Sequence, residues 1–355
     1  MGVAWEPPAC IELPTDVGAL VVAAAVGAGG AAVTQAVALR LACRELRSWG
    51  DAWLAAHADS LRAEEPEAIL ALAGRCRALR TLKLSGCQGA TEEALLSLAP
   101  ACARLTTLEL SHCHEASEHV IITLAGSAAK LEAAALGGLK SVGAAALDAL
   151  AEGCPRLASL DLSRCPGGHG TAPALVRLAA RGGLERLDVS RCSWASEKVL
   201  LSVVLTSGAA LRELRAERCG GVTGDVLRAL AAHAPNLEVL DVSGCAGVDG
   251  RALAAVPARC PRLTRLAAGG AGGLTALQVS RMCARARALT HLDLSRCSPA
   301  AADAALRGAR AGMPALQELD VGSCCSCLED SEVAGSVVAG LEALRTVRPS
   351  LNVWR

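Results

Sequence analysis

The stretch Leu157-Ala158-Ser159-Leu160-Asp161-Leu162-Ser163-Arg164-Cys165 decides the fold of this chain, because its pattern Leu-x-x-Leu-x-Leu-x-x-Cys recurs along the sequence. Seven further copies end in Cys, and two degraded copies lie in phase with them at Leu131–Leu139 and Leu263–Ala271. A fixed period of this kind predicts a repeat protein. The ten copies are spaced 26 or 27 residues apart and start at Leu79, Leu105, Leu131, Leu157, Leu184, Leu211, Leu237, Leu263, Leu289 and Leu316.

Each copy divides into two halves. In the Leu-x-Leu core a leucine occupies every second position, which predicts a short strand with one buried face. The residues that follow have helical spacing of apolar side chains, as in Ala94–Ala99 and Val226–Ala231. A turn such as Cys154-Pro155-Arg156-Leu157 then ends the helix and restarts the strand. Because one unit cannot bury its own leucines, the units must stack into an α/β solenoid with strands on the concave face and helices on the convex face.

This pattern resembles the cysteine-containing subfamily of leucine-rich repeats. Gly221–Asp225 and Gly247–Asp249 fit the helix start that is typical of that subfamily. The resemblance covers residues from about 68 to 355 and implies a leucine-rich repeat horseshoe.

Eight thiols recur at the same place in their repeats. We predict that each points inward at the turn after its strand, where it caps loop carbonyls and packs beside its neighbours. Neighbouring thiols should lie about 5 Å apart, which permits a disulfide, but parallel side chains and a reducing compartment favour free structural thiols. An alternative to free thiols applies to one cluster only. Cys324, Cys325 and Cys327 could start a zinc site, although the sequence places no fourth ligand. The eight are Cys87, Cys113, Cys165, Cys192, Cys219, Cys245, Cys297 and Cys324.

Composition excludes several classes of function. The formal net charge is +0 and the five Trp are the only aromatic residues, which argues against nucleic-acid binding. No Ser/His/Asp or Cys/His/Asn constellation and no phosphate-loop motif is visible, so we expect neither catalysis nor a cofactor or metal. Residues Val17–Leu39 are uncharged and long enough to span a bilayer, but they are rich in Gly and Ala. Without a basic leader in the first sixteen residues, we expect a cytoplasmic or nuclear protein with no membrane partner.

The N-terminal residues predict a small helical hairpin. Leu13-Pro14-Thr15-Asp16 is a good helix opening, Gly27–Gly30 should break that helix, and Val37–Trp49 should form a second one. This arrangement resembles an F-box, with Ala42-Cys43-Arg44-Glu45-Leu46 in place of its second conserved element. The alternative is an ordinary helical cap that shields the first repeat. We therefore divide the chain into an all-α F-box-like region, residues 1–62, and a solenoid, residues 63–355.

F-box proteins with leucine-rich repeats are substrate receptors of SCF-type cullin–RING ubiquitin ligases. The resemblance implies that the N-terminal helices bind a Skp-family adaptor, and through it a cullin scaffold. The concave face would hold a protein substrate for ubiquitin-dependent proteasomal degradation. The chain would supply proximity rather than chemistry. A repeat scaffold that takes part in no ligase is the rival hypothesis. The residues expected to contact the adaptor are Leu13, Pro14, Leu20, Val21, Leu41, Cys43 and Leu46.

The target protein should meet side chains on the strands and just beyond them. A column of acidic residues, Asp161 among them, is typical of the subfamily and is interpreted as a structural ladder. The unit Glu213–Arg218 departs from that pattern. Trp194 is either a hot spot beside the arginines or a side chain folded back over the adjacent loop. The residues expected to contact the target are Glu109, His112, Arg164, Arg191, Trp194, Arg215, Glu217, Arg218 and Arg296.

Overall fold

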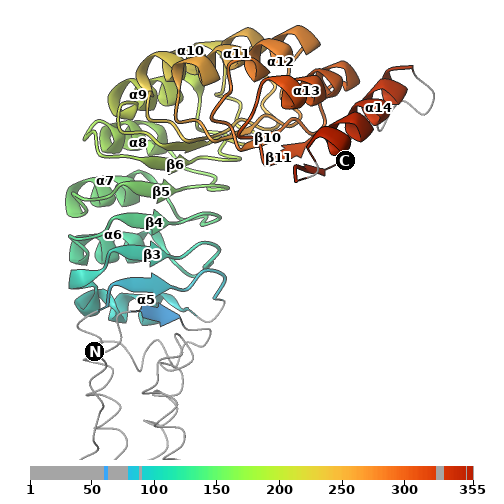
Figure 1. Ribbon diagram of the computed structural model, residues 1–355. Coiled ribbons are helices and arrows are strands. Elements are labelled where there is room, and N and C mark those ends of the chain that lie inside the picture. Colours follow the sequence, from blue (N-terminus) through green and yellow to red (C-terminus); the bar gives the residue numbers. More distant parts are fainter. Residues whose placement is uncertain (1–59, 63–78, 88–89, 325–331, 349, 355) are drawn as a thin grey trace, which may run out of the picture. The chain divides into compact units, whose positions relative to one another are not determined.

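Short strands alternate with helices through the computed structural model, which describes residues 60–62, 79–87, 90–324, 332–348 and 350–354 (Figure 1). The strands are β1 Ser60–Arg62, β2 Thr81–Lys83, β3 Thr107–Glu109, β4 Ala133–Ala135, β5 Ser159–Asp161, β6 Arg186–Asp188, β7 Glu213–Arg215, β8 Val239–Asp241, β9 Arg265–Ala267, β10 His291–Asp293, β11 Glu318–Asp320 and β12 Asn352–Trp354. The helices are α5 Glu92–Ser97, the 3-10 helix η1 Ala99–Arg104, α6 Glu118–Ser127, α7 Ala144–Gly153, α8 Thr171–Ala179, α9 Glu197–Ser207, α10 Gly224–His233, α11 Gly250–Arg259, α12 Ala276–Cys283, α13 Pro299–Ala311 and α14 Glu332–Val347.

The chain forms two compact units. Unit 1 takes the residues up to Ala135 together with Glu152–Leu157, and unit 2 takes Leu136–Ala151 and the residues from Ala158 onward. In unit 1, strands β1 to β4 pair in parallel and in chain order. In unit 2, strands β5 to β12 do the same. In unit 2 the helices α8 to α13 lie on one side of the strands (Figure 1).

The core is a set of leucine ladders. The middle residue of each strand pairs in register with the middle residue of the next, so that Leu160, Leu187, Leu214 and their successors stack in one column. From Leu160 to Leu319 these leucine side chains are at most 2% exposed, and only Val353 at the end of the column is half-buried. Burial of each leucine contributes about 2 kcal/mol, but only when a neighbouring repeat covers it. Stacking therefore supplies the core that a single repeat lacks.

The ends of the helices follow local sequence signals. Thr275 caps α12 through a capping box with Gln278, because the Thr hydroxyl accepts the N–H of Gln278 and the Gln side chain accepts that of Thr275. Pro100 follows α5 and lies in the first turn of η1, so the predicted helix over Ala94–Ala99 splits into a short α-helix and a 3-10 helix. The predicted Cys-Pro turns follow α7 and α11 directly.

The molecule is an α/β solenoid of leucine-rich repeats. All ten strands predicted from the repeat are confirmed, and the structure adds β1 before them and β12 after them. The F-box-like helices, the seven residues expected to contact an adaptor, the stretch Val17–Leu39, and Cys325 and Cys327 lie outside the described residues. In the part of the chain that is described, no helix is long and apolar enough to cross a membrane.

Candidate functional site

The acidic column on the strands shapes the turns that follow. In five repeats an Asp ends the strand, and its Oδ1 accepts the backbone N–H two residues on, at 2.7 to 2.9 Å. This is an Asx turn, which fixes the direction in which the chain leaves the strand. The interpretation of the acidic column as structural is confirmed. The five residues are Asp161, Asp188, Asp241, Asp293 and Asp320.

A left-handed backbone recurs at the residue just before each recurrent Cys, and at the equivalent residue of the two degraded repeats. Glycine occupies this position in four repeats, where it adopts positive φ without steric cost. In five others an Arg or His adopts φ between 50° and 62°, and in the last repeat Ser323 adopts φ 58°, which costs about 1 kcal/mol or more per residue. The glycines are Gly86, Gly138, Gly244 and Gly270, and the five larger side chains are His112, Arg164, Arg191, Arg218 and Arg296.

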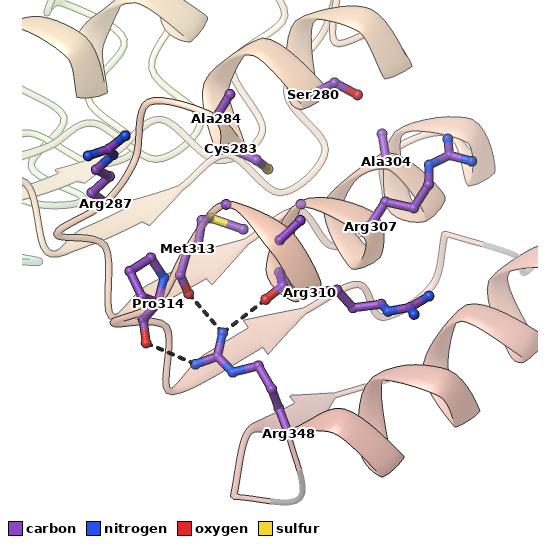
Figure 2. A pocket seen from close by; sticks show the side chains of 14 residues that line it. Ser280, Cys283, Ala284, Arg287, Ala304, Arg307, Arg310, Met313, Pro314 and Arg348 are labelled. Carbon is purple, nitrogen blue, oxygen red and sulfur yellow. Dashed lines mark hydrogen bonds between the residues drawn. The ribbon is translucent and has the colours of Figure 1, made fainter.

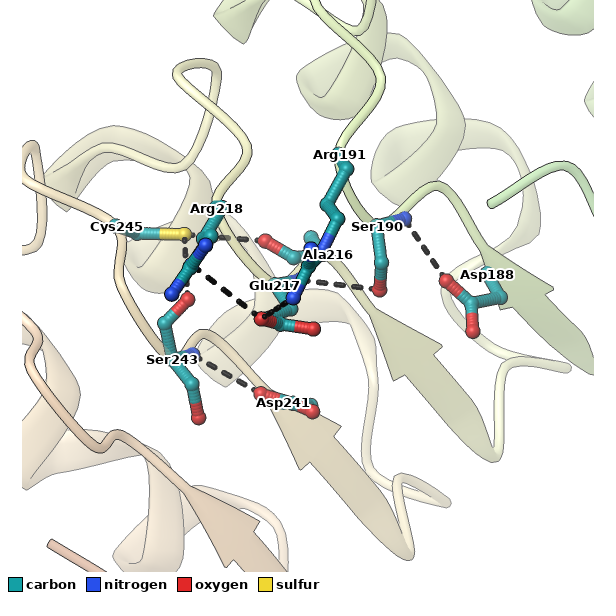
Figure 3. Close-up of polar contacts among 9 residues, drawn as sticks. All are labelled: Asp188, Ser190, Arg191, Ala216, Glu217, Arg218, Asp241, Ser243 and Cys245. Carbon is teal, nitrogen blue, oxygen red and sulfur yellow. Dashed lines mark hydrogen bonds and ion pairs between the residues drawn. The ribbon is translucent and has the colours of Figure 1, made fainter. Parts of the chain in front are cut away.

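Ion pairs join several of these side chains (Figure 3). The Glu217 carboxylate lies 2.8 Å from Arg191 Nη2 and 3.5 Å from Arg218 Nε, so one carboxylate serves two guanidinium groups. Arg215 takes the place of the acidic column on β7, between Asp188 and Asp241, and pairs with Glu213 on its own strand. These charges all remain partly exposed, so each pair contributes little to stability but presents charge to a partner.

Trp194 is folded back onto the loop of the preceding repeat. Its Nε1–H donates to the carbonyl oxygen of Cys165 at 3.0 Å, and the half-buried indole lies against Gly167. A Cβ on Gly167 would lie 2.3 Å from Trp194 Cδ1, so the glycine makes room for the ring. Of the two interpretations of Trp194, the structure shows the folded-back one.

A shallow hollow of about 300 Å³ lies on the strand face of unit 2. It opens where β9 carries Ala267 between Asp241 and Asp293, so the acidic column is interrupted there. Sequence reasoning did not predict this hollow. The signal for it was the degraded repeat Leu263–Ala271, which replaces the acidic residue with alanine.

The recurrent thiols hold neighbouring repeats together. The Sγ of Cys192 donates to the carbonyl oxygen of Leu162 at 3.0 Å, and Cys245 donates in the same way to Ala216 at 3.0 Å. Burial raises the pKa of the Cys192 thiol to about 12 and that of Cys245 to about 11. A thiol with such a pKa is protonated at neutral pH, and it is a poor nucleophile and a poor metal ligand. Among the described residues no group of three His, Cys, Asp or Glu side chains is placed to hold a metal ion.

A larger hollow, of about 740 Å³, lies beside the ends of α12 and α13 (Figure 2). Arg348 fills part of its wall, and its guanidinium donates to the carbonyl oxygens of Ala309, Met313, Pro314 and Leu316. These bonds satisfy carbonyls in the last turn of α13 and just after it, so Arg348 has a structural role. The other arginines around the hollow, Arg287, Arg307 and Arg310, point in different directions in Figure 2.

The structure places the predicted target-contact residues as follows. Glu109, which pairs with Lys83 at 2.8 Å, and His112 belong to unit 1. Arg191, Glu217 and Arg218 come together through their ion pairs. Arg296 lies apart from that cluster, because the glycines Gly244 and Gly270 occupy the equivalent positions of the two repeats between. In unit 2 lie Arg164, Arg191, Trp194, Arg215, Glu217, Arg218 and Arg296.

No family model matches the sequence, and the search of curated proteins gives no match. Rad7, in the crystal structure of the yeast Rad7–Elc1 complex, is similar with a TM-score of 0.57 at 17% identity, over 95% of this chain and 87% of that chain. An internalin, InlF from Listeria monocytogenes, gives a TM-score of 0.46 at 14% identity, over 74% of this chain and 79% of that chain. The likeness to Rad7 agrees with the leucine-rich-repeat fold.

Proposed function

We propose that this chain is a non-catalytic receptor that docks a target protein on its strand face. The observation that carries this proposal is the uninterrupted row of parallel strands β5 to β12, which presents charged side chains in regular columns. Eight strands at about 4.8 Å spacing give a ribbon about 34 Å long, which is enough for a standard protein–protein interface.

The buried thiols support a binding role over a catalytic one. Their raised pKa keeps them protonated, and hydrogen bonds to backbone carbonyls already occupy them. Rad7, which is similar in fold, was crystallised in a complex with the protein Elc1. That complex supports the proposal that the repeats serve binding to other proteins.

The finer proposal is a substrate receptor of an SCF-type ubiquitin ligase, acting in the cytoplasm or nucleus. Its support is in the sequence: Leu13-Pro14 opens the expected first helix, and Ala42–Leu46 resembles the second F-box element. In this assembly the N-terminal helices would bind a Skp-family adaptor, and the strand face would hold the target near a ubiquitin-conjugating enzyme.

Co-purification with a Skp-family adaptor tests the ligase proposal. We expect the wild-type chain to retain the adaptor, and a Leu13→Ala, Pro14→Ala double variant to lose most of it. Leu205→Ala is the matched control, because Leu205 is an exposed leucine on α9, 60% accessible, and should not touch the adaptor. Equal recovery with all three chains, or none with any, would favour the rival scaffold that takes part in no ligase.

A further inference from the structure

Three arginines occupy equivalent positions in successive repeats of unit 2: Arg164, Arg191 and Arg218, here called the arginine row. We propose that the arginine row binds a short acidic segment of the target protein, a run of Asp or Glu side chains in extended conformation. This inference rests on the proposed function, since it names the chemistry of the partner that the strand face docks.

The backbone holds the three arginines side by side. The N–H of Arg164 donates to the carbonyl oxygen of Ser190, and the N–H of Arg191 donates to that of Glu217, at 2.8 and 2.7 Å. Each arginine is therefore tied to the residue that precedes the next one in the row. With strands about 4.8 Å apart, the row is about 10 Å long. An extended peptide covers that length with about three residues.

The backbone conformation gives the row an independent argument. Four other repeats use glycine at this position, since glycine adopts positive φ freely. Arg164, Arg191 and Arg218 adopt φ of 58°, 61° and 50° without that freedom. Glycine would serve the turn at least as well, so folding does not account for three consecutive arginines. His112, Arg296 and Ser323 share this conformation, so the run of three charged side chains, and not the strain itself, points to binding.

Charge along the row is not balanced. Arg191 and Arg218 share the single carboxylate of Glu217. Among the described residues, no carboxylate oxygen lies within the 4.0 Å ion-pair distance of the Arg164 guanidinium. Nearby Asp161 and Asp188 each use one carboxylate oxygen in an Asx turn. The exposed guanidinium groups therefore offer donors to carboxylates from outside the chain.

An acidic peptide fits this surface better than a nucleic acid does. The sequence has no Phe or Tyr, and Trp194 is folded onto its own loop, so no aromatic side chain of the described surface near the row is free to stack on bases. The strands that lead into the row carry Asp161, Asp188 and Arg215, and the next strand carries Asp241. These three carboxylates would repel a long polyanion. A short acidic segment can lie along the three arginines and avoid the carboxylates of the strands.

Titration of the full chain with a short fluorescein-labelled polyglutamate peptide, at low salt, tests the proposal. The variant Arg164→Gly, Arg191→Gly, Arg218→Gly removes the charges and installs the residue that sister repeats use, so the fold is retained. We expect this triple variant to bind about tenfold more weakly, from three partly exposed charge pairs. Glu217→Gln frees two guanidinium groups and should tighten binding by about threefold.

Arg296→Gly is the matched control. It removes an arginine with the same backbone conformation, φ 57°, three strands away from Arg218, and should leave the affinity nearly unchanged. Polyglutamine of equal length should not bind. The proposal is overturned if the wild-type chain does not bind polyglutamate, if the triple variant binds it equally well, or if a single-stranded RNA competes with the peptide with higher affinity. Loss of peptide binding with adaptor co-purification intact refutes this inference alone, whereas the reverse refutes only the ligase assignment.

Discussion

The thiol of Cys192 lies 3.0 Å from the carbonyl oxygen of Leu162, which belongs to the preceding repeat. Cys113 donates in the same way to Leu84, Cys165 to Leu136 and Cys324 to Leu294. The recurrent Cys is thus a link between repeats, because it gives a second hydrogen bond to a carbonyl oxygen that already accepts a backbone N–H of its own repeat.

Replacing this thiol should lower the stability of the chain. Cys192→Ala leaves the Leu162 carbonyl without its side-chain donor and opens a small cavity in a site that is 1% exposed. We expect the free energy of unfolding to fall by about 1–3 kcal/mol, measured by urea denaturation. Ser193→Ala, at the exposed next residue, should change it by less than about 0.5 kcal/mol. Equal urea midpoints for the two variants would contradict the structural role of the thiol.

Stability should fall in alkali. Burial raises the pKa of the Cys102 and Cys283 thiols from 9.0 to about 12, and that of Cys165 to about 11. Above pH 9 the unfolded chain loses thiol protons that the folded chain keeps, so the unfolded state binds fewer protons and the free energy of unfolding decreases as pH rises. Each such thiol lowers it by up to about 1.4 kcal/mol per pH unit.

Urea denaturation at intervals from neutral pH upward measures this effect. The chain contains no Tyr, so no phenol ionises in the same window. Between pH 9 and 11 the free energy of unfolding of the Cys165→Ala variant should decrease less steeply than that of the wild type. A flat profile over that window would show that the thiols are not protected in the folded state.

Substitutions at the left-handed position should differ in their effect on stability. Gly244→Ala forces a side chain into φ +67°, with its Cβ 2.7 Å from Arg218 Cγ, and should destabilise the chain by about 1–2 kcal/mol. Arg191→Gly relieves a strained residue but makes the unfolded chain more flexible, so stability should change by less than about 1 kcal/mol. Thermal unfolding of both variants checks this, and a large loss for Arg191→Gly would mean that the arginine serves the fold.

Arg348 should anchor the C-terminal residues. Arg348→Ala removes donors to four carbonyl oxygens, one in the last turn of α13 and three after it, and we expect the free energy of unfolding to fall by about 2 kcal/mol. Amide hydrogen exchange should speed up in α14 and β12 before it does in β8. Arg310→Ala, at an exposed arginine beside the same hollow, is the control and should leave exchange unchanged. Equal amide exchange rates in α14 and β12 for the two variants would rule out the anchoring role.

Part of the candidate site could be predicted from the sequence. The positions of Arg191, Glu217 and Arg218 just beyond their strands followed from the repeat register, because a fixed period places equivalent residues side by side. The sharing of Glu217 between two arginines did not, since it depends on rotamers that the pattern does not specify. The orientation of Trp194 was open for the same reason, and it is decided by the carbonyl of Cys165 and the space above Gly167.

The sequence alone determined the repeat length, the strand positions and the inward thiols, because leucines at a fixed period can be buried only by stacking. The tertiary structure decided which arginines have a strained backbone, which of them form ion pairs, and where a hollow interrupts the acidic column. At Ala267 the missing carboxylate becomes a hollow only because β8 and β10 bring Asp241 and Asp293 to either side of it. Such features depend on contacts between residues about 26 positions apart, which exist only once the repeats have stacked.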